Sequence, residues 1–552
     1  MEEVTVYVAA GRTLVGDDIT QLSSSSSKVA VAVAGGLFQI SPLYSGLIVV
    51  AHVVLAASRQ EFDSREGKNF CSVKSRVGGH HLWDTLSTAT GFTSHALRLA
   101  GFLPGQLGAS IRIRFGNKGI YKTLMFGNPS IIVTVPEVCR KVLLDDNTFK
   151  PGWPLSTVQL AGRKSFIGIT NEEHKRLRKM TKGPLNGQEA LSMYLHYIET
   201  NVVLALENWS NMGRIEFLTE LRRLTIKIIL YVFLSSEIEN LVETLEAECT
   251  TFNYGIRSMA INLPGFTYYK ALKAVVKVHY FVVPTLVVHP FTLVYWDEGG
   301  EARKKLVNIL QGVVSKRRKQ NEMFQEISRK DMLDLLLDCE DDNGMKLGDE
   351  EIVDMLITYL NAGHESSGHV TMWATVFLQS HPEFFQIAKE EQERIVKNIP
   401  PGQKGLTMKE YRQMEYLSKV IDETLRLVSF SFMTFREAKE DVEVKGYVIP
   451  KGWKVLLWYR SLHHDPENYT KPKEFNPSRW DDFVPIPGTY IPFGGSRLCP
   501  GKDLAKLEIS IFLHHFLLNY KLERENPGCP VMYLPYPRPK DNCSGRVIKH
   551  TN

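Results

Sequence analysis

The sequence lacks the paired cysteines that would indicate a zinc site or a redox dithiol. Its seven cysteines are an odd number spread over 552 residues, with no C-x-x-C spacing, so neither a metal cluster nor a disulfide framework is expected. A reducing environment for the main domain follows. In such an environment one cysteine can serve as a ligand or nucleophile, while the others act as small apolar residues.

The chain also lacks a strong excess of charge of one sign. Its formal net charge is +5, which predicts no nucleic-acid partner, although a pI near 8.6 suits an anionic membrane or an acidic partner. No G-x-S-x-G elbow, G-x-G-x-x-G turn or phosphate-binding loop is present. The hydrophobic content of 43% is sufficient for a large buried core. We therefore expect a folded protein outside the hydrolase, dinucleotide-binding and NTPase classes.

Acidic and basic residues are missing altogether from Val29 to Ser58. This stretch is long enough to span a bilayer, so we predict an N-terminal membrane anchor at 29–58. A buried hairpin and a processed targeting peptide are the alternatives. Residues 1–28 are then a leader of unclear role, and residues 59–112 carry little pattern and are treated as a linker.

The rest of the chain has mainly helical periodicity. Short alternating segments follow residue 112 and recur at 441–458, and they predict strands with turns. Apolar residues at spacings of three and four predict helices over 189–209, 218–234, 349–378 and 414–427, and an apolar helix follows Gly501. We therefore predict a mainly α fold with small β-sheets, of the α+β class, in a single domain over 113–552. The apolar, proline-broken segment at about 278–301 is interpreted as an insertion.

A glycine-rich loop near the C-terminus, Phe493-Gly-Gly-Ser-Arg-Leu-Cys499-Pro-Gly501, carries the first candidate for chemistry. A loop with few side chains lets a flat cofactor approach the backbone, and amides at a helix N-terminus can stabilise a thiolate. Cys499 therefore fits an axial thiolate ligand of haem iron, with Arg497 available for a propionate. Taken alone, however, a single cysteine in such a loop is more often structural.

Three further motifs accompany this loop. Glu423 and Arg426 lie one helical turn apart and can form an ion pair, and Arg479 follows in a proline-containing loop. In the helix predicted at 349–378, Ala362-Gly-His-Glu365-Ser366 combines two small residues with an acid and a hydroxyl. Such a pair can bind water and relay protons, while small residues let a ligand approach the helix.

In order and spacing these four motifs resemble the signatures of the cytochrome P450 superfamily. The resemblance implies the P450 fold, haem b ligated by Cys499, and a structural triad of Glu423, Arg426 and Arg479. It also implies catalytic roles for Glu365 and Ser366. The remaining cofactor-binding residues that it implies are His174, Arg178, Ala362, Gly363, Arg436, Phe493, Arg497 and Gly501. His174 stands where the family motif has tryptophan, and it still offers a donor for a propionate.

Longer stretches, such as YLNAGHESSGH and MEYLSKVIDETLRL, are similar to plant ent-kaurenoic acid oxidases. This similarity implies successive NADPH- and O2-dependent oxidations of ent-kaurenoic acid to gibberellin A12. It also implies electrons from a separate NADPH-cytochrome P450 reductase, and an endoplasmic reticulum membrane location with the catalytic domain in the cytosol. The plastid envelope is the alternative location. Relatives that oxidise triterpenes of the beta-amyrin type leave a second substrate class open, because the composition identifies no substrate.

One departure from the family pattern concerns the cysteine loop. Phe493 lies six residues before Cys499 rather than the usual seven, so one glycine is missing. Two other functional classes therefore remain alongside the monooxygenase. One is a haem isomerase or dehydratase that uses no reductase, against which the pair Glu365 and Ser366 argues. The other is a degraded paralogue with impaired haem binding.

Overall fold

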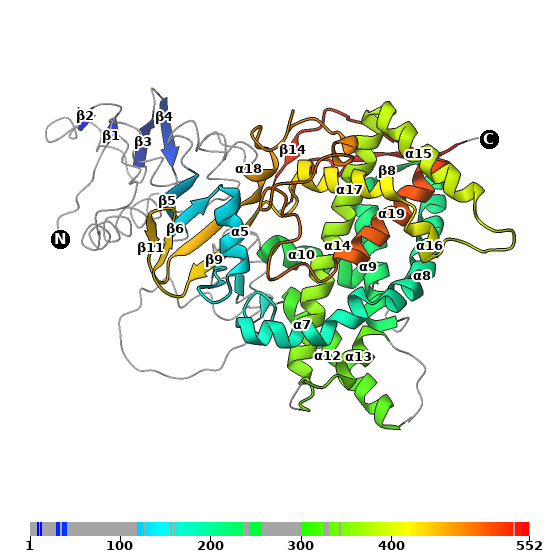
Figure 1. Cartoon of the computed structure of the whole chain (residues 1–552), viewed down its shortest axis with the longest axis horizontal. Helices are drawn as coiled ribbons and strands as arrows, with labels where there is room; N and C mark the ends of the chain where they lie inside the picture. The colour runs from blue at the N-terminus through cyan, green and yellow to red at the C-terminus, as the bar shows by residue number, and fades with distance from the viewer. Residues whose placement is uncertain are drawn as a thin grey trace.

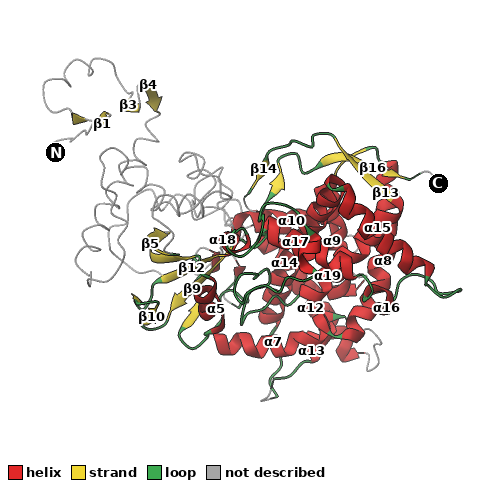
Figure 2. Ribbon diagram, turned by 45° about the horizontal axis from the view of Figure 1, so that its top comes forward, coloured by secondary structure: helices red, strands yellow, loops and turns green. Residues whose placement is uncertain are grey.

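The computed structural model describes residues 8–9, 12–13, 29–33, 36–40, 119–125, 128–154, 157–158, 161–162, 164–235, 242–256, 301–323, 331–341, 344–533 and 536–550. Within these ranges the chain forms a helix-rich body with one larger sheet and several small ones, as Figure 1 and Figure 2 show. The predicted mainly α fold with small sheets is confirmed.

The larger sheet has five strands and lies at one side of the helical body (Figure 2). Its spatial order is β5 (Ile120–Met125), β6 (Asn128–Val133), β12 (Lys454–Trp458), β9 (Met433–Ala438) and β7 (Phe149–Pro151). Only the β6–β12 pair is parallel. Helix α5 (Pro136–Leu144) shares a buried apolar cluster with the sheet through Val142 and Val455. This cluster fixes the end of α5 beside the cysteine loop.

Helix α14 (Asp349–Ser380) runs through the centre of the helical part (Figure 1). It is buried nearly all round, from Ile352 to Leu378, which is expected of a helix packed on every side. Its first turn holds three acidic residues, whose negative charges interact favourably with the positive end of the helix dipole. One of them, Glu351, also accepts a hydrogen bond from the Gly348 N–H, which would otherwise have no partner in the helix. The other helices are α7 (Asn171–Asn186), α8 (Gln188–Asn211), α9 (Phe217–Leu234), α10 (Val242–Ile256), α12 (Glu301–Met323), α13 (Met332–Asp338), α15 (Pro382–Lys397), α16 (Met408–Tyr411), α17 (Glu415–Val428), α18 (Tyr459–His463) and α19 (Lys502–Asn519), with the 3-10 helix η4 (Pro477–Trp480).

The small sheets of the body are antiparallel. Strands β8 (Arg214–Glu216), β13 (Tyr520–Arg524) and β16 (Ser544–Lys549) form a three-stranded antiparallel sheet. Strands β14 (Val531–Met532) and β15 (Arg538–Pro539) form a two-stranded one. The hairpin predicted over 441–458 is found as β10 (Val442–Val444) and β11 (Tyr447–Ile449), which turn at Lys445 and Gly446. Residues 454–458 instead join the larger sheet as β12.

The N-terminal predictions fall mostly outside the described residues. Within 1–40, β1 (Val8–Ala9) pairs with β2 (Arg12–Thr13), and β3 (Val29–Val33) forms a hairpin with β4 (Gly36–Ile40). Residues 41–58 of the predicted anchor, the linker at 59–112 and residues 278–300 of the predicted insertion lie outside those ranges. Among the residues that are described, none of the helices combines the length and the apolar character needed to span a bilayer.

Candidate haem and substrate site

The cysteine loop is held between helix α5 and the start of α19. The Ser496 N–H donates to the Leu143 carbonyl at the end of α5, at 3.1 Å, and the Cys499 N–H donates to the Phe493 carbonyl at 2.9 Å. Gly494 adopts a φ of +87°, which glycine takes without strain. At Gly495 an added Cβ would lie 2.6 Å from the Leu143 Cβ, so the loop and α5 approach as closely as backbone allows. Although the loop is one glycine shorter than the family pattern, these backbone contacts therefore hold it closed.

Cys499 opens onto the large central cavity. This cavity has a volume of about 560 Å³, and both Cys499 and Phe493 line it. Burial raises the pKa of the Cys499 thiol, whereas a hydrogen bond from the Gly501 N–H at the start of α19 lowers it. A coordinated metal ion deprotonates a thiol outright. The site thus provides a cysteine that is inert by itself and is able to become a thiolate ligand.

Helix α14 forms part of the wall of the same cavity. Ala362, Gly363 and Ser366 line it together, and the Ser366 hydroxyl donates to the Ala362 carbonyl at 2.7 Å. Gly363 has a second function, because an added Cβ would lie 2.3 Å from Cδ1 of Ile229 in α9. Glycine at this position therefore allows close packing of two helices as well as access for a ligand.

Glu365 points away from the cavity, toward α9. It is fully buried and forms an ion pair with Arg222, with Nε and Oε2 3.1 Å apart. Burial raises the pKa of Glu365, and the Arg222 charge opposes the rise. Burial and the same arginine lower the pKa of His364 to about 3 and that of His369 well below its usual value, so both imidazoles are neutral. The structure separates the two predicted catalytic residues, since only Ser366 reaches the cavity.

A second cavity, of about 250 Å³, adjoins the first and collects basic side chains. Arg178 and His174 of α7 line it together with Arg436 of β9 and Arg497 of the cysteine loop. One buried nitrogen of each arginine, Nη1 of Arg178 and Arg436 and Nε of Arg497, has no hydrogen-bond partner. The nearest acid is Asp146, whose carboxylate lies 3.5 Å from Arg436.

The charges in this second cavity are not balanced. Burial and the neighbouring Arg436 lower the pKa of Arg497 to about 10, and burial also lowers the pKa of Arg436. Burial and the charges of Arg497 and Arg178 lower the pKa of His174 to about 4, which leaves its ring neutral. Three arginines with unpartnered donors around one cavity favour an anion there, and carboxylates match the guanidinium geometry.

The two cavities together fit a haem. They share lining residues, among them Ala362, Arg497 and Gly494. A flat group could therefore lie with one face toward Cys499 and its propionates toward the arginines. The fit rests on the unpartnered donors in the second cavity and on the thiol in the first. All of the cofactor-binding residues predicted from the sequence line one or both cavities: His174, Arg178, Ala362, Gly363, Arg436, Phe493, Arg497, Cys499 and Gly501.

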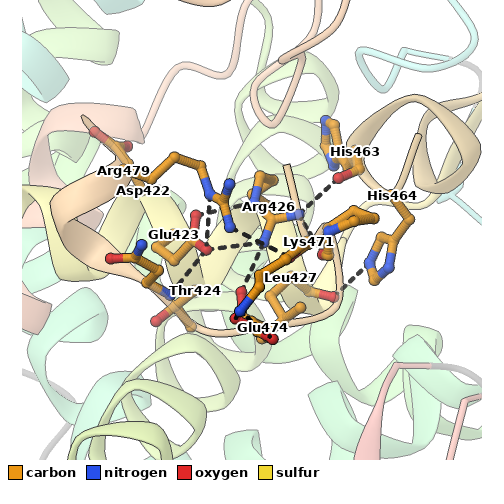
Figure 3. Close-up of polar contacts among 12 residues, drawn as sticks. Asp422, Glu423, Thr424, Arg426, Leu427, His463, His464, Lys471, Glu474 and Arg479 are labelled. Carbon is orange, nitrogen blue, oxygen red and sulfur yellow. Dashed lines mark hydrogen bonds and ion pairs between the residues drawn. The ribbon is translucent and has the colours of Figure 1, made fainter. Parts of the chain in front are cut away.

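Glu423, Arg426 and Arg479 meet outside the cavities (Figure 3). The Glu423 carboxylate accepts two hydrogen bonds from Arg426, at 2.8 and 2.9 Å, and one from Arg479 at 3.4 Å. Arg426 also donates to the carbonyls of His463 and Pro472, each at 2.7 Å. The ion pair therefore ties α17 to the segment that leads into the cysteine loop.

One acid of the cavity was not singled out in the sequence. Glu508 of α19 lines the large cavity and is fully enclosed. Burial raises its pKa to about 8, and the nearby Ser367 hydroxyl opposes this rise. A neutral carboxyl group is expected here at neutral pH. The signal available in the sequence was one glutamate in a stretch, LEISIFL, whose only other polar residue is a serine, in a helix that must be buried.

Fold and site together define a haem-thiolate protein, and comparison of the chain with known proteins agrees. Residues 113–535 match the family Cytochrome P450, so the chain belongs to the cytochrome P450 family and is a P450 monooxygenase. It is 58% identical to "Ent-kaurenoic acid oxidase 2" of Arabidopsis thaliana over 79% of this chain and 83% of that protein. It is 50% identical to "7,8-epoxymelianol synthase CYP88A154" of Ailanthus altissima over 79% of this chain and 82% of that protein.

A solved structure supports the same assignment of the fold. The retinoic acid-bound cyanobacterial CYP120A1 superposes with a TM-score of 0.69 at 26% sequence identity. The match covers 82% of this chain and 96% of that one. The predicted P450 fold and the predicted family are therefore confirmed.

Proposed function

We propose that this protein is an ent-kaurenoic acid oxidase. In this proposal it converts the diterpenoid acid to gibberellin A12 in successive steps that consume O2 and NADPH. The observation that carries the proposal is the 58% identity to the Arabidopsis thaliana enzyme over 79% of the chain. The cavity agrees with it, because about 560 Å³ lies within the range of roughly 300–1,000 Å³ for small-molecule sites and its exposed surface is mainly apolar.

Several of the predicted site residues take a role in this proposal. Cys499 would ligate the iron, and His174, Arg178, Arg436 and Arg497 would hold the propionates, the three arginines through buried nitrogens that have no partner. When bound, the haem would supply the activation of dioxygen, favoured by electron donation from the Cys499 thiolate.

Two residues of α14 are assigned to proton supply. Ser366 hydrogen-bonds water at the cavity wall, where its oxygen can still accept after donating to the Ala362 carbonyl. Glu365 lies on the side of α14 that faces away from the cavity. It supplies the proton, which requires its carboxyl group to break the ion pair with Arg222.

The surroundings of the enzyme are also part of the proposal. Electrons come from a separate NADPH-cytochrome P450 reductase. An anchor within residues 29–58 holds the chain in the endoplasmic reticulum membrane, and the catalytic domain faces the cytosol. The absence of Asp, Glu, Lys and Arg from Val29 to Ser58 supports an anchor.

Haem ligation is tested first. Full-length protein is reduced and treated with carbon monoxide, and the Soret band of a thiolate-ligated complex is recorded for wild type, Cys499→Ser and Cys529→Ser. Cys529 is the matched control, because it is an unpaired cysteine in a surface turn. We expect the band in wild type and Cys529→Ser only. Its absence from the wild type would overturn the haem assignment.

Substrate class is tested next in microsomes that also contain the reductase. Ent-kaurenoic acid and beta-amyrin are supplied separately with NADPH, and products are identified by mass spectrometry. We expect 7-hydroxylated and ring-contracted products from the diterpenoid acid and none from beta-amyrin. Conversion of beta-amyrin alone, by protein that shows the carbon monoxide band, would replace the diterpenoid assignment with the triterpene one.

A further inference from the structure

Asn253 of α10 places an uncommitted hydrogen-bond donor in the large cavity. The residue lines that cavity and is 1% exposed. Its side-chain nitrogen Nδ2 is buried and has no partner, whereas its oxygen Oδ1 accepts a hydrogen bond from the Tyr536 hydroxyl at 3.2 Å. Since a buried unpaired donor is costly, a ligand that accepts from Nδ2 gains a strong preference for this position.

Tyr536 holds the amide in this orientation. Its ring is 3% exposed and stacks on Phe430, with centroids 4.1 Å apart and planes at 12°. His369 of α14 packs against both rings, with centroids 5.3 and 5.5 Å away. Rings enclosed on several sides lose little further freedom when a ligand binds. The acceptor of Asn253 is thus fixed, and its donor is left for the cavity.

Apart from Arg497, the cationic and histidine donors that line the same cavity are already committed. Lys506 donates to Asp422 at 2.8 Å. His463 contacts the Ser429 hydroxyl through Nδ1 at 3.1 Å and accepts from the Ile491 N–H through Nε2. Arg497 belongs to the cysteine loop and to the arginine cluster of the second cavity. Among the cavity-lining residues that the structure describes, Asn253 and Arg497 alone have a buried side-chain donor nitrogen without a partner.

We propose that Asn253 binds a carboxyl oxygen of a terpenoid acid through Nδ2, with Tyr536 as its positioning residue. This inference rests on the proposed function and names the contact that recognises the acid. In a cavity with mainly apolar walls, one fixed polar contact sets the orientation of a rigid hydrocarbon, and therefore which carbon lies near Cys499. A hydrocarbon of the same shape without the carboxyl group binds without this contact.

The test compares ligand affinities by equilibrium dialysis against the haem-bound, full-length protein. The ligands are ent-kaurenoic acid, the corresponding primary alcohol and the parent hydrocarbon. For Asn253→Leu we expect the affinity for the acid to fall about 10-fold or more, the weakening that loss of a hydrogen bond to a charged group causes. The affinity for the hydrocarbon should not fall. Asn361→Leu is the matched control, because Asn361 lines the same cavity but leaves only an acceptor, Oδ1, unpartnered.

A second variant keeps the shape of the side chain. Asn253→Asp retains the acceptor for Tyr536 but replaces the donor with a carboxylate oxygen. This variant should repel the acid and still bind the alcohol, whose hydroxyl can donate to the carboxylate. The alcohol should therefore bind more tightly than the acid, the reverse of the order in wild type. Unchanged affinity for the acid in both Asn253 variants would overturn this inference alone. So would an equal loss of affinity for the hydrocarbon. If wild type fails to bind the acid, the proposed function is overturned together with it.

Discussion

Replacing Glu423 by alanine tests the ion-pair network around Arg426. Both side chains are 0% exposed, so Glu423→Ala leaves a buried guanidinium without its counter-ion. That change costs about 3–5 kcal/mol. The backbone N–H of Asn476 and the indole N–H of Trp480 lose their acceptor as well, at 3.1 and 3.2 Å in the intact protein. Domains are stabilised by only about 5–15 kcal/mol in total, so the variant should lose a large part of its stability.

The control for this prediction is Glu474→Ala. Its carboxylate pairs with Lys471 at 3.2 Å at the surface, where the two side chains are 60% and 70% exposed, and such pairs contribute about 0–1 kcal/mol. Urea unfolding followed by far-UV circular dichroism gives the midpoints for wild type and both variants. We expect a large fall for Glu423→Ala and little change for Glu474→Ala. Equal midpoints for the two variants would refute the assignment of Glu423 as the buried counter-ion.

Three further predictions concern the cavities. Arg178→Ala should retain less haem than wild type in a pyridine haemochrome assay, whereas Lys175→Ala, on the exposed face of the same helix, should retain as much; equal retention would contradict a propionate contact. Gly363→Ala should lower the melting temperature, because overpacking costs about 1–3 kcal/mol. Adding Ile229→Val, which removes the clashing Cδ1, should recover most of the lost melting temperature. If the double variant shows no recovery, the contact with Ile229 is not the cause of the loss. Burial raises the pKa of Glu508 from 4.5 to about 8, so the folded chain keeps a proton that the unfolded chain releases, and stability falls as pH rises through this window. Glu508→Gln should remove that contribution, and its unfolding free energy relative to wild type should rise between pH 4.5 and about 8; a difference independent of pH would argue against a buried neutral carboxyl.

The secondary structure could be predicted well where one periodicity dominates. Helices expected at 218–234 and 414–427 are found at Phe217–Leu234 and Glu415–Val428, because a single apolar face of period 3.6 is encoded locally. The strands of the larger sheet were recognisable as strands, but their partners were not. Lys454–Trp458 pairs with β6, more than three hundred residues earlier, and no local pattern encodes that choice.

The site could be predicted as a set of residues, but not as a geometry. Cys499, Arg178 and Arg436 come from distant segments, and tertiary packing brings them to two adjoining cavities. The orientation of Glu365 could not be foreseen, because its partner Arg222 lies 143 residues earlier, on another helix. Helical spacing places adjacent residues about 100° apart. Glu365 and Ser366 must therefore face different surroundings, but only the packing of α9 decides which of them faces the cavity.

The sequence by itself determined the chemistry that the protein carries. A cysteine in a glycine-rich loop, an acid and a base one helical turn apart, and a glycine in an apolar helix are properties of residue type and spacing, and both are present before folding. The tertiary structure decided which polar atoms remain without partners. Functional roles for Asn253, the arginine cluster and Glu508 follow only from their burial, because burial removes water. A buried donor or acceptor must then find its partner in the protein or in a ligand.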